Sequence, residues 1–407
     1  MRIIYLHQYF NTPDMPGGTR SYELARRLVA RGHEVHMVTT WRRHDDRHDW
    51  FRSEEAGIQV HWLPVRYSNH MNYGERIRAF LRFAWGASRY ASRLQADLVF
   101  ATSTPLTIAL PALAAKQRLG VPMVFEVRDL WPELPIAIGA LRNPVLRSAA
   151  RRLERQAYHE AAAVIALSPG MAEGVARTGY PSSRIHVIPN GADLGHFGDD
   201  SARDAFRAGL PGLDARPLIG YIGTLGKING VSYLVDIAAA ALRLAPELRF
   251  LIVGKGAEEV AIRQRAEQLG VLGRNLTLLP PMSKQTIPPV FAACDVVLSL
   301  FIDLPEMQAN SANKFFDGFA AGRPIAINYG GWQAELLERH GAGMRLAGWC
   351  PETAARQLAA WTENPDTLRQ AGQNSRSLAE REFDRDALAI AFERVLLGAA
   401  ESGRRST

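Results

Sequence analysis

The fold is decided by residues 2–40, RIIYLHQYFNTPDMPGGTRSYELARRLVARGHEVHMVTT. The apolar run at residues 2–9 predicts a strand, and a loop rich in proline and glycine follows it. Residues 19–31 repeat apolar side chains at helical spacing up to Gly32, and residues 33–40 predict a second strand. A strand, a glycine loop, a helix and another strand form one doubly wound α/β unit.

The same alternation continues along the whole chain. Further strands are predicted at residues 97–101, 122–127, 163–167, 185–189, 218–222, 249–253, 276–279, 295–300 and 324–328. Short apolar strands that alternate with helices indicate parallel sheets covered on both faces. The fold class is therefore α/β, with doubly wound parallel sheets.

The chain of 407 residues is long enough for two domains. The segment around residues 196–216 is polar and rich in turn residues, so we place the linker there. It separates residues 1–195 from a second domain at residues 217–384. A terminal helix at residues 385–407 is expected to pack back on the first domain. Two such domains facing a cleft would offer ligand sites at the carboxyl ends of their strands.

The composition is that of a globular protein, with 47% hydrophobic and 22% charged residues. Two cysteines cannot form a disulfide framework, and Cys294 lies in an apolar run that predicts a buried thiol. No run of about 18 apolar residues predicts a membrane span, and the first residues do not resemble a secretion signal. These features favour a cytoplasmic protein.

The positive charge is concentrated in the first half of the chain. Residues 1–195 hold 25 Lys and Arg against 17 Asp and Glu, a net charge of +8, and the rest carries a net charge of −1. Either this half faces an anionic partner, such as phosphate or membrane headgroups, or the protein comes from an arginine-rich proteome. Nucleic acid is not expected, because no reader module is recognisable.

Five motifs run in the same order over nearly the whole chain. They are YLHQYFNTPDMPGGTRS at residues 5–21, VRDLWPE at 127–133, VIPNGAD at 187–193, GYIGTLG at 220–226 and NKFFDGFAAGRPI at 313–325. Together they resemble family 4 glycosyltransferases of the GT-B fold, and in particular the bacterial O-antigen and capsule enzymes described as L-fucosamine transferases.

The resemblance implies two Rossmann-like domains and a retaining glycosyltransferase. Such an enzyme moves a sugar, here an N-acetylated hexose or deoxyhexose, from a UDP-linked donor to a lipid-linked or glycan acceptor in surface polysaccharide synthesis. Retention in this family is discussed as a same-face attack that needs no protein nucleophile. None of the five motifs contains an Asp-x-Asp, so neither a metal nor another cofactor is expected.

Two glycine loops are candidates for contacts with the donor diphosphate. Gly17 and Gly18 precede a helix whose N-terminus favours anions, although a plain tight turn is an equally good interpretation. In the second domain, Gly223 and Thr224 follow a strand. Relatives place a diphosphate-binding Arg at the Thr224 position, so the resemblance implies that the positive charge comes from elsewhere.

That charge is expected from Lys227 or Lys314. An exposed, solvated side chain is the alternative for Lys314. The resemblance also places Asp317 at the second acid of a family pair, where it would accept hydrogen bonds from the ribose, while the first acid is missing. Three polar residues at the start of the same helix are further anion-binding candidates: Asn310, Ser311 and Asn313.

The acceptor side is expected to involve Arg128, Asp129 and Glu133. Arg cannot act as a general base, so Arg128 would stabilise phosphate or sugar charge. Asp129 could orient or deprotonate the acceptor hydroxyl, and a buried Arg–Asp contact of structural importance is the alternative. Glu133 is a further candidate carboxylate.

Two basic amphipathic stretches, residues 74–93 and 143–158, could lie on the inner face of an anionic membrane. Solvated helix faces are the alternative. Two other functions also stay open. One is a non-hydrolysing sugar-nucleotide 2-epimerase, which shares the two-domain architecture, and the other is a non-catalytic nucleotide-sugar-binding protein.

Overall fold

The computed structural model describes residues 1–15, 17–43, 45–67, 71–210, 212–213 and 215–404. The chain forms two compact units. Unit 1 consists of Met1–Pro189 with Asp386–Thr407, and unit 2 consists of Asn190–Arg385. The stretch 196–216, where we expected a linker, lies within unit 2 and contains the helix α7 (Arg203–Ala208); its residues 211 and 214 lie outside the described residues.

Unit 1 contains an eight-stranded sheet in the order β3-β4-β2-β1-β5-β6-β7-β8. Its strands are β1 (Arg2–Leu6), β2 (Glu34–Trp41), β3 (Phe51–Glu55), β4 (Ile58–Pro64), β5 (Leu98–Thr102), β6 (Met123–Val127), β7 (Ala163–Ala166) and β8 (Ile185–Val187). All neighbours pair in parallel except β3 and β4, which form an antiparallel hairpin at one edge. Sequence patterns did not predict this hairpin.

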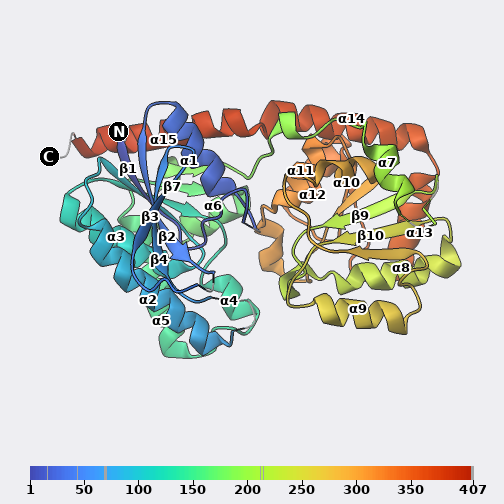
Figure 1. Ribbon diagram of the computed structural model, residues 1–407, viewed down its shortest axis with the longest axis horizontal. Coiled ribbons are helices and arrows are strands. Elements are labelled where there is room, and N and C mark those ends of the chain that lie inside the picture. Colours follow the sequence, from blue (N-terminus) through green and yellow to red (C-terminus); the bar gives the residue numbers. More distant parts are fainter. Residues whose placement is uncertain (16, 44, 68–70, 211, 214, 405–407) are drawn as a thin grey trace. The chain divides into compact units, whose positions relative to one another are not determined.

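Helices cover both faces of this sheet (Figure 1). They are α1 (Arg20–Ala30), α2 (Tyr73–Ala91), α3 (Ala109–Leu119), α4 (Glu133–Ala137), α5 (Pro144–His159), α6 (Pro169–Ala176) and α15 (Arg385–Arg404). α1 and α15 pack on one face, where Leu28 and Phe392 join the core around Tyr5. α2, α3 and α5 lie on the other face (Figure 1).

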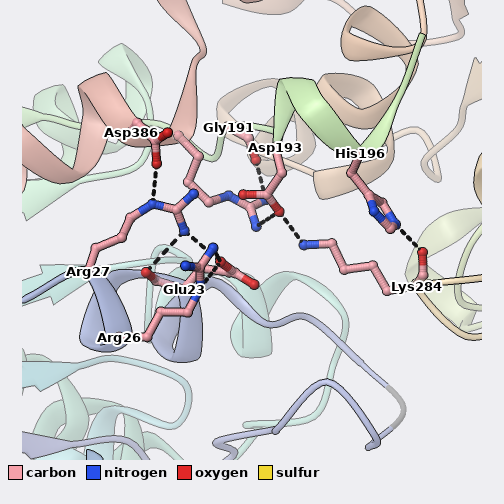
Figure 2. A network of polar contacts seen from close by, with 9 residues as sticks. Glu23, Arg26, Arg27, Gly191, Asp193, His196, Lys284 and Asp386 are labelled. Carbon is pink, nitrogen blue, oxygen red and sulfur yellow. Dashed lines mark hydrogen bonds and ion pairs between the residues drawn. The ribbon is translucent and has the colours of Figure 1, made fainter. Parts of the chain in front are cut away.

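The C-terminal helix α15 is part of the core of unit 1. The Phe392 ring meets Phe100 edge-on with 4.9 Å between ring centroids. Glu393 accepts hydrogen bonds from Arg31 and His33. At the start of the helix, Asp386 pairs with Arg27 (Figure 2). Apolar burial and ion pairs therefore attach the end of the chain to its first helix and strands.

Unit 2 contains a six-stranded, wholly parallel sheet in the order β11-β10-β9-β12-β13-β14. The strands are β9 (Leu218–Ile222), β10 (Arg249–Val253), β11 (Leu276–Leu279), β12 (Val296–Ser299), β13 (Ile325–Ile327) and β14 (Gly343–Arg345). Apolar residues fill most positions of its central strands, as expected for strands buried on both faces.

The helices of unit 2 again form two layers (Figure 1). Besides α7 they are α8 (Ser232–Leu244), α9 (Glu259–Gln268), α10 (Pro288–Ala293), α11 (Asn313–Ala320), α12 (Trp332–His340), α13 (Pro351–Thr362) and α14 (Pro365–Glu382). α8, α9 and α13 pack on one face. Cys294, which follows α10, is buried as predicted, and burial raises the pKa of its thiol to about 12.

The strand order reverses once in each parallel array. In unit 1 the reversal falls between β1 and β5, and in unit 2 between β9 and β12. Helices leave neighbouring strands toward opposite faces at such a point, which opens a crevice at the carboxyl ends of the strands. The candidate site residues are considered below against these two positions.

Candidate functional site

The loop that leaves β9 at Gly223 is held against the loop that leaves β10. The amide of Leu225 donates to the carbonyl of Lys255 at 2.9 Å. A Cβ on Gly254 would lie 1.9 Å from the Gly223 carbonyl oxygen, and a Cβ on Gly256 would lie 2.2 Å from the Leu225 oxygen. The two glycines of this second loop are therefore required by close backbone packing.

Lys314, the second residue of α11, is buried beside this loop. Its Nζ donates to the Tyr221 hydroxyl at 2.7 Å. The same nitrogen lies 4.3 Å from the centroid of the Tyr221 ring and 5.3 Å from that of Phe301. A Cβ on Gly223 would lie 3.7 Å from it. Lys314 thus connects the ends of β9 and β12, and the interpretation as an exposed lysine is wrong because the residue is 9% exposed.

No carboxylate of the described residues lies within 4.0 Å of the Lys314 ammonium. Burial alone lowers the pKa of Lys314 to about 7, because removing the ammonium from water disfavours its charged form. The two aromatic rings and the tyrosine oxygen compensate part of this cost. An anion beside Lys314 would restore the charged form.

The other lysine candidate, Lys227, lies in the short 3-10 helix η4 (Lys227–Asn229) and is exposed. Thr224 is exposed too, and its carbonyl accepts a hydrogen bond from the Tyr221 hydroxyl at 2.8 Å. Of the two expected sources of charge, Lys314 is therefore the one buried beside Gly223.

Asn310 and Ser311 hold the backbone at the start of α11. The Asn310 side chain donates to the carbonyl of Met307 and accepts from the amide of Ala312. Ser311 accepts a hydrogen bond from the Asn190 amide at 3.2 Å. These contacts fix the turn from which the helix begins at Asn313, and no side chain caps that helix end.

Asp317 lies one turn beyond Lys314 in a different neighbourhood. It is half-buried, and burial raises the pKa of its carboxyl to about 6, while the nearby charges of Arg385 and Lys284 oppose this shift. Both cations bind the Asp193 carboxylate, Lys284 at 2.6 Å and Arg385 at 2.8 Å (Figure 2). Asp317 is thus not an ordinary surface acid.

The glycine loop of unit 1 is closely packed as well. Gly17 has a φ of +126°, and a Cβ there would lie 2.6 Å from Nδ2 of Asn11. The same Nδ2 donates to the carbonyl of Gly18 at 3.2 Å. Both the backbone conformation and the lack of space explain the glycine at position 17.

Arg128 and Asp129 follow β6 directly, beside β5. Asp129 accepts a hydrogen bond from the Thr104 hydroxyl at 3.0 Å, and burial raises the pKa of its carboxyl. Thr104 has a φ of +102°, an unfavourable conformation for a β-branched residue. Nη1 of Arg128 lies 3.4 Å from Nε2 of His7. Among the described residues, Arg128 and Asp129 form no ion pair within 4.0 Å, so the alternative of a direct Arg–Asp contact is not observed.

Glu133, the third acceptor-side candidate, starts α4 and lies 3.7 Å from Arg151 of α5. Sequence patterns did not single out Arg20, whose guanidinium pairs with the fully buried Glu126 at 2.9 Å and donates to the carbonyls of Ile188 and Pro189. A glutamate inside an apolar strand was the available signal. This ion pair is satisfied within the protein.

Within the described residues, no cluster of three or more His, Cys, Asp or Glu side chains is arranged to hold a metal ion. In the same part of the chain, no helix has both the length and the apolar character needed to cross a bilayer.

Two family matches agree with the division into units. Residues 17–191 match the family "Glycosyl transferase 4-like domain", and residues 216–364 match "Glycosyl transferases group 1". Both matched segments are thus described as glycosyltransferase domains.

Curated relatives of this chain align over part of their lengths. A D-inositol 3-phosphate glycosyltransferase of Segniliparus rotundus is 28% identical over 72% of this chain, and the match spans 65% of that relative. An alpha-D-kanosaminyltransferase of Streptomyces kanamyceticus is 23% identical, over 66% of this chain and 68% of that protein. The chain therefore matches slightly less than two thirds of the first relative.

Solved structures confirm the GT-B fold predicted for this chain. HepE from Anabaena, in complex with UDP and glucose, has a TM-score of 0.73 at 18% identity and covers 98% of this chain and 100% of its own. Sucrose-phosphate synthase from Thermosynechococcus elongatus has a TM-score of 0.76 at 16% identity, with 97% and 98% covered. At such identities the likeness concerns the fold alone.

The buried lysine generates a prediction about pH. In the folded protein the pKa of Lys314 is about 7, against an ordinary value of 10.5. Between these values the unfolded chain binds more protons, so this residue makes stability rise with pH. We expect the free energy of unfolding of Lys314→Met, relative to the parent, to fall as the pH rises from about 7 to about 9. Denaturant unfolding at a series of pH values measures it.

The matched control is Arg243→Met, which removes a positive charge from an exposed position in the same unit. The difference in the free energy of unfolding between Arg243→Met and the parent should stay constant over the same pH range. If the difference in the free energy of unfolding between Lys314→Met and the parent were also constant, the lowered pKa of Lys314 would be contradicted.

Proposed function

We propose that this protein is a glycosyltransferase, which transfers a sugar, with retention, from a UDP-linked donor bound by unit 2 to a lipid-linked or glycan acceptor bound by unit 1. Following the resemblance of its motifs, the sugar is an N-acetylated hexose or deoxyhexose, and the product is a surface polysaccharide. The observation that supports this proposal most is Lys314, a buried ammonium without a carboxylate partner at the switch point of unit 2.

A nucleoside diphosphate supplies the negative charge that the described residues around Lys314 do not provide. Its phosphate oxygens would neutralise the Lys314 ammonium, and the missing Cβ of Gly223 leaves them room beside it. The start of α11 at Asn313 adds the positive end of the helix dipole. Asp317, one turn further along the helix, would accept hydrogen bonds from the ribose hydroxyls. The structural relative crystallised with UDP supports uracil as the base.

The chemistry requires stabilisation of a departing diphosphate more than a protein nucleophile. Lys314 and oriented backbone amides provide it, because their charge and dipoles act where negative charge develops. In unit 1, Asp129 would orient the acceptor hydroxyl or accept its proton, since Thr104 holds its carboxylate and burial raises its pKa. Arg128 would stabilise negative charge, with Glu133 as a second acceptor-side acid.

The affinity for UDP is the first test of the proposed donor site. We expect Lys314→Ala and Asp317→Ala each to weaken UDP binding about 10- to 100-fold, the effect of losing a hydrogen bond to a charged group. Isothermal titration with UDP measures the affinity. Arg243→Ala, an equal loss of charge at an exposed position of unit 2, should bind UDP like the parent. Parent-like affinity in both Lys314→Ala and Asp317→Ala would rule out this donor site.

An activity assay distinguishes the proposed transferase from a 2-epimerase and from a non-catalytic nucleotide-sugar-binding protein. Incubated with UDP-sugars and a lipid-linked acceptor, a transferase releases UDP only when the acceptor is present. Conversion of one UDP-sugar into another without an acceptor would identify a 2-epimerase. Tight binding without turnover would identify a nucleotide-sugar-binding protein. A panel of UDP-sugars compared by thermal stabilisation selects the donor, because a ligand that binds only the folded state raises the melting temperature.

The role of Asp129 gives a second kinetic prediction. We expect Asp129→Asn to lower kcat at least about 100-fold, the range of general acid–base catalysis, while UDP affinity stays within a factor of about two. Steady-state kinetics with the selected donor measures both. Thr104→Val, which removes the hydroxyl that holds Asp129, should show a smaller loss. An unchanged kcat in Asp129→Asn would exclude the acceptor role.

We also propose that unit 1 contacts an anionic membrane surface. Four exposed apolar residues follow one another at four-residue spacing along α2: Tyr73, Ile77, Leu81 and Trp85. Exposed arginines lie among them, and the guanidinium of Arg89 lies 4.9 Å from the centroid of the Trp85 ring. An exposed apolar stripe beside arginines suits the boundary between headgroups and acyl chains. α5, with exposed Val145 and three exposed arginines, covers the same face of the sheet (Figure 1).

Vesicle binding tests this surface. We expect the protein to co-sediment with vesicles that contain phosphatidylglycerol and much less with pure phosphatidylcholine, with binding weakened by salt. The double variant Leu81→Glu, Trp85→Glu should lose most of the binding. Val260→Glu, at an equally exposed apolar position on α9 of unit 2, is the control. Equal sedimentation of both variants would contradict a role for α2.

A further inference from the structure

Two arginines and a histidine gather in unit 1 where the strands β1, β2 and β6 end. His7 directly follows β1, Arg42 directly follows β2 and Arg128 directly follows β6. Nη1 of Arg128 lies 3.4 Å from Nε2 of His7. Arg42 donates to the carbonyl of Phe10 at 3.2 Å and also binds the Asn11 side chain. The charges of both arginines act on His7 and, together with its burial, hold its pKa well below 6.5.

The two guanidinium charges are not neutralised within the protein. Among the described residues, neither Arg42 nor Arg128 has a carboxylate within 4.0 Å, in contrast to Arg20, which pairs with Glu126. Both arginines are half-buried, and burial lowers the pKa of Arg42. Two partly buried positive charges near the same histidine are unfavourable unless an anion joins them.

His7 carries a hydrogen-bond donor without an acceptor. The residue is 4% exposed, and its Nε2 faces a guanidinium N–H, so Nε2 accepts and the proton of the neutral ring is assigned to Nδ1. Nδ1 is buried and has no partner among the described residues. A buried N–H without an acceptor is costly, and such groups are commonly explained by a ligand or an ion.

The glycine loop adjoins the same cluster. Asn11 accepts a hydrogen bond from Arg42 and donates to the carbonyl of Gly18, which connects Arg42 with the segment that leads into α1. The groups gathered here are donors and positive charges, with Asn11 as the polar connection between them. They suit the oxygens of a phosphate, which accept hydrogen bonds from guanidinium groups in a planar, bidentate arrangement.

We propose that His7, Arg42 and Arg128 form a phosphate-binding site of unit 1, and that the phosphate or diphosphate bound there belongs to the acceptor. The assignment to the acceptor rests on the proposed glycosyl transfer, whereas the phosphate site itself does not. The acceptor class is then a sugar or lipid that carries a phosphate near the hydroxyl to be glycosylated. The donor diphosphate is the other possible source of the same chemistry.

Inorganic pyrophosphate is the probe for this site. The full-length protein is saturated with UDP, so that the donor site is occupied, and pyrophosphate is added in an isothermal titration. We expect one pyrophosphate to bind per chain. Arg42→Gln and Arg128→Gln should each weaken it about 10- to 100-fold, and Arg42→Lys, which keeps the charge but loses the bidentate fork, should weaken it less. Arg243→Gln should bind it like the parent.

The outcomes separate this proposal from the donor site. No pyrophosphate binding in the presence of UDP, or equal binding by Arg42→Gln and the parent at parent-like melting temperatures, would overturn the phosphate site. If Arg42→Gln weakened UDP as much as pyrophosphate, the cluster would serve the donor and the acceptor assignment would fail. Failure of the proposed transfer shows itself separately, as parent-like UDP affinity in both Lys314→Ala and Asp317→Ala.

Discussion

Parallel pairing brings the carboxyl ends of neighbouring strands to one edge of a sheet, and this constraint determines where the chain can place its functional groups. In unit 1 it brings together the residues that follow β1, β2 and β6, which are distant in sequence. In unit 2 it places the loop after β9 beside the residues that follow β12. The strand order reverses at these positions, and open α/β sheets bind their ligands at such switch points.

At each edge lies a basic side chain that has no carboxylate partner within 4.0 Å among the described residues. Lys314 lies between two aromatic rings and donates to a tyrosine, a solvation much weaker than that of water. Such a residue lowers the stability of the empty protein. Its retention at a switch point beside a closely packed glycine loop is what a binding site for an anion requires, since an anion turns the unfavourable burial into a favourable charge pair.

Local sequence patterns predicted the repeating architecture and failed where long-range contacts decide. Alternating apolar strands and helices predicted both sheets, and the glycine loops marked the ends of β1 and β9. The β3–β4 hairpin was missed because its turn uses Ala56 with a φ of 51°, a conformation that alanine does not signal. The polar stretch expected as a linker instead lies within unit 2, where Arg207 of α7 donates to the carbonyl of Ala293.

Local sequence patterns also could not predict which charged residues the fold buries. Lys227 and Lys314 were both candidates in sequence, and their burial could not be predicted there, because burial of a lysine depends on which rings the fold places around it. Arg20 and Arg42 likewise differ in the groups that the fold places around their guanidinium groups. Arg20 meets a glutamate from β6 that is 106 residues away. Among the residues that the structure describes, Arg42 meets carbonyl and amide oxygens and a tyrosine ring, and no carboxylate. Residue type alone does not distinguish a structural cation from a ligand-binding one.

What distinguishes them is whether a carboxylate accompanies the buried cation. Lys284 and Arg385 share the carboxylate of Asp193, and Arg20 has that of Glu126, so each of these charges is satisfied before any ligand arrives. A ligand phosphate would gain little by approaching them, because it would first have to compete with a carboxylate at hydrogen-bonding distance. Lys314, Arg42 and Arg128 present no such competition among the described residues. By this criterion the two switch points, and not the most highly charged parts of the chain, are where phosphate groups should bind.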